Sequence, residues 1–179
     1  MRIVKLNGIF DHTKEIEIVK DKNGEKGVEV ITPFYTHLDE QGNPCGISVN
    51  RGWIAKDNIE GMKYRYAITK GDITGVLYPG DPQTKYSLPN NFLTGENSRA
   101  DPYDFSLVHQ LPNKEEASKF MLLQVDTNPK ARQIVPSCPD ANELTKFRIS
   151  PERHEAYSSL WRMITLVGVV ANTTLWLYF

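Results

Sequence analysis

The sequence predicts a mainly β fold, an antiparallel sheet or partly open barrel with short helices, followed by one C-terminal transmembrane helix. Short segments rich in β-branched and aromatic residues are separated by turn residues. No long helical period lies between these segments, which argues against βαβ units. After Arg162 the chain carries no charged side chain. A polar domain that ends in an apolar helix accounts for all three observations.

The composition is that of about one domain without a nucleic-acid signature. The chain has 179 residues, of which 40% are hydrophobic, enough to form a core. Lys and Arg number 21 against 22 Asp and Glu, so no cationic field attracts nucleic acid. Cys45 and Cys138 lack a metal-binding spacing, and two unpaired thiols are favoured over a disulfide. The N-terminal residues show no signal or transit peptide.

Strands are predicted wherever a two-residue alternation lies between turn signals. Turn-forming stretches such as KDKNGEKG and DEQGNP separate the candidates. The alternation suits a sheet with one buried face. The predicted strands are residues 14–19, 27–32, 46–55, 63–68, 73–78 and 119–126.

Two short helices are predicted between the last two strands. Asp101 is a candidate N-cap, and Pro102 takes the first helical position. Asn113 and Glu116 have the spacing of a capping box, which indicates a second helix.

The chain is expected to divide into a β-rich soluble domain, residues 1–149, and a C-terminal helix, residues 150–179. Ser150 is a suitable N-cap and Pro151 a suitable first residue for this helix. Residues 161–179 form the expected membrane span, which as a helix is roughly 25–30 Å long.

Aromatic side chains lie at both ends of the span, as in membrane helices, with Trp161 at one end and Trp176 at the other. Asn172 is a polar residue within it, which predicts packing against other membrane helices. A buried core helix is the alternative that the residues leave open.

No catalytic constellation is visible in the sequence. It contains four histidines but no HExxH, P-loop, GxGxxG or GxSxG motif. Its carboxylates are scattered over predicted turns. We therefore expect that the protein is not an enzyme.

One histidine has a suggestive position. His154, Tyr157 and Trp161 are spaced i, i+3 and i+7, which places them on one face of the C-terminal helix. The imidazole could ligate a haem iron while the two aromatic rings pack on the porphyrin. The alternative is an interfacial histidine that bonds to headgroups or to a partner subunit.

Four stretches occur in the order typical of the Surfeit locus family of cytochrome c oxidase assembly factors, which the sequence resembles. They are NGIFDHTKEIEI, VITPF, GISVNRGWIAKD and RHEAYSSLWRMITLVGVV, and they bracket nearly the whole chain. The shared positions are Gly8, Phe10, Thr32, Pro33, Phe34, Val49, Asn50, Arg51, Gly52, Trp53, His154, Tyr157 and Trp161.

The resemblance implies a membrane-tethered protein of oxidase biogenesis that contacts the haem-bearing catalytic subunit and the lipid bilayer. It implies a location in the mitochondrial inner membrane or a bacterial membrane, with the domain in the intermembrane space or the periplasm, whereas the basic residues before the span favour the opposite side. The mitochondrial location is favoured. Haem a is the implied cofactor and His154 its implied ligand. Arg51 could pair with a propionate, Gly52 permits a close backbone approach and Trp53 offers a docking surface; alternatively, these three fix the fold.

The sequence also departs from the family pattern. It begins at the first strand of the domain, so we expect the family's first membrane helix to be lost or supplied by another polypeptide. Residues 90–104 lack an expected tryptophan. Two roles therefore compete, a retained accessory subunit of the oxidase or its supercomplex and a transient assembly factor that binds haem a through His154. The first is favoured.

Overall fold

A computed structural model describes residues 3–59, 68–126, 136–139, 144 and 151–178 of the chain. It divides the chain into two units, Met1–Ala141 and Asn142–Phe179. The first unit contains the strands and the short helices, and the second contains the long helix.

The first unit is mainly β, which confirms the predicted fold class. The predicted segment 63–68 falls almost entirely outside the described residues, and its last residue, Ile68, begins a strand. The first strand was missing from the pattern-based prediction and was implied only by the resemblance. The strands are β1 (Ile3–Asp11), β2 (Ile16–Val19), β3 (Gly27–Leu38), β4 (Pro44–Ala55), β5 (Ile68–Tyr78) and β6 (Met121–Gln124).

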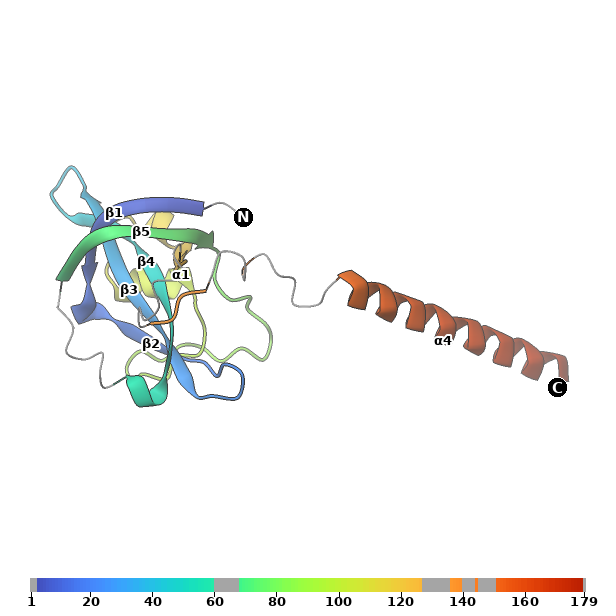
Figure 1. The fold of residues 1–179 in the computed structure, drawn as a ribbon. Helices are drawn as coiled ribbons and strands as arrows, with labels where there is room; N and C mark the ends of the chain where they lie inside the picture. The colour runs from blue at the N-terminus through green and yellow to red at the C-terminus, as the bar shows by residue number, and fades with distance from the viewer. Residues whose placement is uncertain (1–2, 60–67, 127–135, 140–143, 145–150, 179) are drawn as a thin grey trace. The chain divides into compact units, whose positions relative to one another are not determined.

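Five of these strands close into a barrel. The sheet order is β1-β5-β6-β4-β3-β2, and β1 also pairs with β3 through Ile9↔Tyr35 and Phe10↔Phe34. Figure 1 shows β1 and β5 running side by side, as their long antiparallel register requires. β2 pairs with β3 outside this closure. Only the pairing of β4 with β6 is parallel among the described strands.

The barrel interior is filled by apolar side chains, one from each of its five strands. Phe34 and Leu122 are fully buried, and the Phe10 and Phe34 ring centroids lie 4.6 Å apart. The alternation of each strand sends these side chains inward. The cluster comprises Phe10, Phe34, Val49, Ile73 and Leu122.

Both predicted short helices are present, but only one is capped as expected. In α1 (Pro102–Val108) the Asp101 carboxylate accepts a hydrogen bond from the Tyr103 amide at 3.0 Å. In α2 (Lys114–Ala117) the capping-box prediction is wrong, because the Asn113 side chain makes no cap hydrogen bond. It accepts from the Gly46 amide at 3.1 Å and donates to the Gly46 carbonyl at 2.9 Å.

The second unit contains α4 (Pro151–Tyr178), a helix long and apolar enough to cross a membrane. Its large apolar side chains are exposed, as Leu166 illustrates at 67%. The Ser150 proposed as its N-cap lies outside the described residues. This long exposed apolar helix is what the sequence pattern predicted.

Candidate functional site

The stretch Asn50–Trp53 forms an irregularity in β4. Asn50 is paired with Ile31 of β3, and Trp53 is paired with Glu29. Two residues of β4, Arg51 and Gly52, therefore oppose one residue of β3, the arrangement of a β-bulge. A bulge changes the directions of the neighbouring side chains, so the side chains around Arg51 and Gly52 point differently from those of a regular strand.

Gly52 has a backbone that few other residues adopt. Its φ is 114°, and its amide donates to the Asn50 side-chain oxygen at 2.9 Å. A Cβ at Gly52 would lie 2.4 Å from the Ser137 carbonyl oxygen. Trp53 and Ser137 exchange two backbone hydrogen bonds of 3.1 and 2.8 Å. Gly52 thus lets a distant segment dock on β4.

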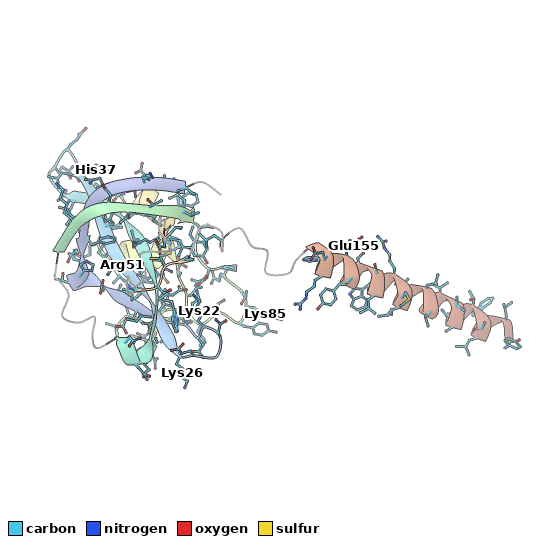
Figure 2. All side chains as sticks on the ribbon, in the orientation of Figure 1. Lys22, Lys26, His37, Arg51, Lys85 and Glu155 are labelled. Atoms are coloured by element: carbon cyan, nitrogen blue, oxygen red, sulfur yellow. The ribbon has the colours of Figure 1, made fainter. Side chains whose placement is uncertain are left out.

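The Arg51 side chain is held inside a polar cluster, with 12% of it exposed. Its guanidinium donates to Glu15 Oε1 at 2.5 Å and lies 5.3 Å from the Phe10 ring centroid. The same carboxylate oxygen accepts from Thr32 Oγ1 at 3.0 Å and contacts His12 Nδ1 at 2.6 Å. The cluster therefore ties the end of β1 and the start of β2 to β4. Figure 2 labels Arg51 within the barrel unit.

Trp53 connects this stretch to a second polar cluster. Its indole N–H donates to the Lys20 carbonyl at 2.7 Å. The Lys20 ammonium lies 3.3 Å from both Glu29 Oε2 and Asp81 Oδ2. Burial lowers the pKa of Lys20, but the two carboxylates outweigh burial and raise that pKa above its ordinary value. Lys20 is therefore a charged structural group near neutral pH.

Cys138 lies against the same bulge as a neutral thiol. Its Sγ donates to the Arg51 carbonyl at 2.9 Å. Burial and the nearby Asp126 raise its pKa to about 11. Cys45 is buried, and neither cysteine is in a disulfide, which confirms the expectation of two unpaired thiols. A thiol in this state serves as a hydrogen-bond donor rather than a nucleophile.

The other predicted site lies on α4. His154, Tyr157 and Trp161 all fall within this helix, and the last two are 52% and 65% exposed. Their spacing puts them on one helical face. Within the described residues, no three His, Cys, Asp or Glu side chains group to hold a metal ion. The His154 imidazole is exposed, so it is open to an external ligand.

Sequence reasoning found Arg51, Gly52 and Trp53 but missed the residues that hold them. Glu15 meets Arg51 across 36 positions, and Asp81 meets Lys20 across 61. No local spacing encodes such contacts, which depend on strand register. One feature of the sequence could have drawn attention to Glu15. Its carboxylate lies at the start of the predicted strand 14–19, beside a stretch rich in β-branched residues.

Comparison with known proteins identifies the family of the chain. No curated protein matches the sequence. The model of the SURF1 family matches residues 1–166, which cover the barrel, the Asn50–Trp53 bulge and the His154 face of α4. That family is associated with cytochrome c oxidase assembly. The chain therefore belongs to the SURF1 family.

Proposed function

We propose that this protein takes part in cytochrome c oxidase biogenesis and is retained on the oxidase or its supercomplex as a membrane-anchored accessory subunit. The observation that carries the proposal is the combination of a SURF1-family barrel with α4, whose apolar side chains are exposed along its length. Exposed apolar surface of that extent is stable in hydrocarbon or against other membrane helices. Its partners are the oxidase subunits, above all the haem-bearing catalytic subunit, and the bilayer.

The Asn50–Trp53 bulge supports a scaffolding role rather than a catalytic one. The Arg51 guanidinium is engaged by Glu15, and the Trp53 indole N–H is engaged by the Lys20 carbonyl. Because both groups are occupied by contacts within the barrel, they stabilise the barrel surface and do not position a reactant. The proposed location is the mitochondrial inner membrane, with the barrel in the intermembrane space.

A second candidate role is transient binding of haem a, and the His154 face of α4 favours it. There the His154 imidazole would hold the haem iron, while Tyr157 and Trp161 would pack against the macrocycle. A partner would have to supply the remaining surroundings. In this role haem a is a cargo that is delivered to the catalytic subunit.

The two roles are separated by purifying the oxidase under mild detergent and quantifying this chain by mass spectrometry. A retained subunit should be present at about one copy per oxidase. Its absence from mature oxidase would contradict retention, and a haem absorbance band on the isolated chain would then favour the carrier role.

Two histidine variants distinguish the haem-carrier role from the retained-subunit role. His154→Ala should abolish a haem band if the carrier role holds, whereas His37→Ala, at the exposed end of β3, should leave the band unchanged. If the protein is a retained subunit, both variants should remain on the oxidase at the wild-type ratio.

A further inference from the structure

A hollow of about 310 Å³ opens on the barrel unit beside β2. It lies where the start of β2 approaches the loop that precedes α1 and the C-terminal end of α1. Its walls include Glu15, Ile16, Glu17, Phe92, Asn97 and Val108. None of the lining residues is basic. Glu15, Ile16 and Glu17 belong to the NGIFDHTKEIEI stretch, but the proposed function assigns no role to the hollow itself.

Asn97 places an unpaired acceptor in the wall of the hollow. The residue is 3% exposed, and its Nδ2 donates to the Glu17 carbonyl at 3.2 Å. Its own carbonyl accepts from the Val19 amide at 2.8 Å, so the residue is fixed along the free edge of β2. Because Nδ2 is committed to the Glu17 carbonyl, the unpaired atom of the side chain is Oδ1, which is buried and has no hydrogen-bond partner in the described part of the chain. A ligand in the hollow would have to displace the atoms that cover Oδ1 in order to reach it.

The charge of the hollow is negative. The Glu17 side chain is exposed, and among the described residues no group pairs with its carboxylate. Glu15, on the inner side, is already bound by Arg51, so its charge is largely compensated. Two acceptors of the hollow therefore lack a hydrogen-bond donor within the described residues, the Glu17 carboxylate and the Asn97 side-chain oxygen. Both favour a cation that carries N–H groups.

The rest of the lining is apolar and continues onto the surface. The Phe92 ring packs edge-on against Phe105, with centroids 5.6 Å apart, which holds it rigidly. Val108 is 38% exposed at the end of α1, and Leu93 is fully exposed beside Phe92. An apolar wall beside acceptor oxygens matches a side chain that has an alkyl stem and a cationic head.

We propose that this hollow, which we call the β2 hollow, binds a basic side chain, preferentially arginine, of a partner polypeptide. The alkyl stem would lie on Phe92 and Val108, and the guanidinium would donate to the Glu17 carboxylate and Asn97 Oδ1. Arginine is preferred because its planar fork can serve two acceptors at once, whereas lysine offers a single point charge. Leu93 would contact the residues flanking the arginine. The proposal concerns the barrel alone and is independent of the proposed oxidase role.

The test uses the full chain, labelled with ¹⁵N in detergent micelles at low salt. N-acetylarginine amide should shift the Glu17 backbone and Asn97 side-chain resonances saturably. N-acetylcitrulline amide, the neutral isostere, should not shift them. An extended peptide with a central arginine flanked by leucines should bind at least fivefold more tightly than N-acetylarginine amide.

Matched charge reversals complete the test. Glu17→Lys should weaken peptide binding at least tenfold, whereas Glu25→Lys, at the exposed turn between β2 and β3, should leave the affinity unchanged. Equal shifts from arginine and citrulline, or equal losses in the two variants, would overturn the proposal. If the leucine-flanked peptide binds no more tightly than N-acetylarginine amide, the hollow selects only a small cation. That result would contradict a polypeptide partner.

Discussion

The barrel and α4 are built from the same kinds of apolar side chain in opposite surroundings. Phe34, Val49 and Leu122 of the barrel have no exposed surface, whereas Leu166 and Val170 of α4 are 67% and 54% exposed. In the strands apolar residues alternate with polar ones, so one face is buried and the other meets water. In α4 they occupy most positions from Met163 to Tyr178, and Asn172 and the threonines are the polar exceptions. The order of apolar and polar residues along a segment, rather than the number of apolar residues, therefore indicates the surroundings that the segment suits.

Charges follow the same division. In the barrel, Arg51 and Lys20 are each bound by carboxylates of other strands or turns. In α4 the last charged residue is Arg162, and the remaining turns carry none. The barrel thus uses ion pairs to connect its elements, whereas most of α4 carries no charge, a pattern typical of membrane spans.

The sharpest test of the comparison is to truncate an apolar side chain in each region. Phe34→Ala should lower the free energy of unfolding of the barrel by about 3–5 kcal/mol, because it leaves a cavity in the closed core. Leu166→Ala should change the same quantity by less than about 0.5 kcal/mol. Urea denaturation in detergent, followed by near-UV circular dichroism, measures both. Equal losses would mean that Leu166 belongs to the barrel core.

A second test concerns backbone geometry within the barrel. Gly52→Ala should destabilise it by about 2–4 kcal/mol, because positive φ and the contact with the Ser137 carbonyl combine. Gly24→Ala, at φ 84° with no atom within 4 Å of the added Cβ, should cost only about 1 kcal/mol. Thermal melts of the two variants compare them directly. A smaller loss for Gly52→Ala would contradict docking of the Ser137 segment on the bulge.

A third test moves one charge between the regions. Val170→Lys should disfavour membrane insertion of α4 by about 2.5–3.5 kcal/mol, the cost of a lysine near the centre of a span. The chain should then shift into the supernatant when membranes are washed with alkaline carbonate. Val19→Lys, on the exposed barrel face, is the control and should remain with the pellet. Retention of Val170→Lys in the membrane would argue that α4 is anchored by something other than its apolar surface.

The smallest effect concerns a buried histidine of the barrel. His109 is 1% exposed and contacts Ser48 Oγ at 2.9 Å through Nδ1; burial lowers its pKa to about 4. Because the unfolded chain binds this proton near pH 6.5 and the folded one does not, stability falls as the pH drops below 6.5. The loss from this group between pH 7 and pH 5 is about 2 kcal/mol.

Variants isolate that contribution from the carboxylates that also titrate in acid. His109→Gln should have a shallower decline of unfolding free energy between pH 7 and pH 5, even if its stability at pH 7 is lower. His37→Gln should decline like the wild type. A His109→Gln profile parallel to the wild type would show that the buried imidazole accepts its proton without cost.

Local pattern predicted most strands but not how they meet. The segments at 27–32, 46–55 and 119–126 are rich in apolar residues; the first two lie within β3 and β4, and the third contains β6. In β1 the outward Ile3 and Ile9 blur the alternation, because apolar residues occupy both faces, so the pattern alone missed it. Barrel closure rests on two residue pairs between β1 and β3, and no propensity encodes such a contact.

The candidate site divides in the same way. Arg51, Gly52 and Trp53 could be selected from the sequence because the stretch VNRGW resembles a motif of the Surfeit locus family. Their partners could not, since Ser137 and Cys138 reach the bulge from more than 80 positions away. The Asn113 error has the same cause, because a side chain suited to a local cap found a better partner in Gly46.

The Asn113 amide has a consequence for pairing between copies of the molecule. β6 pairs only with Val49 and Asn50, so the first part of β4 reaches beyond its neighbour on that side. At Gly46 the Asn113 carboxamide occupies both backbone groups, just as a residue of an adjoining strand would. An open strand edge invites pairing with an identical neighbour. By acting as a one-residue surrogate strand, the Asn113 carboxamide occupies the hydrogen-bonding groups that Gly46 would otherwise offer to a strand of a second molecule.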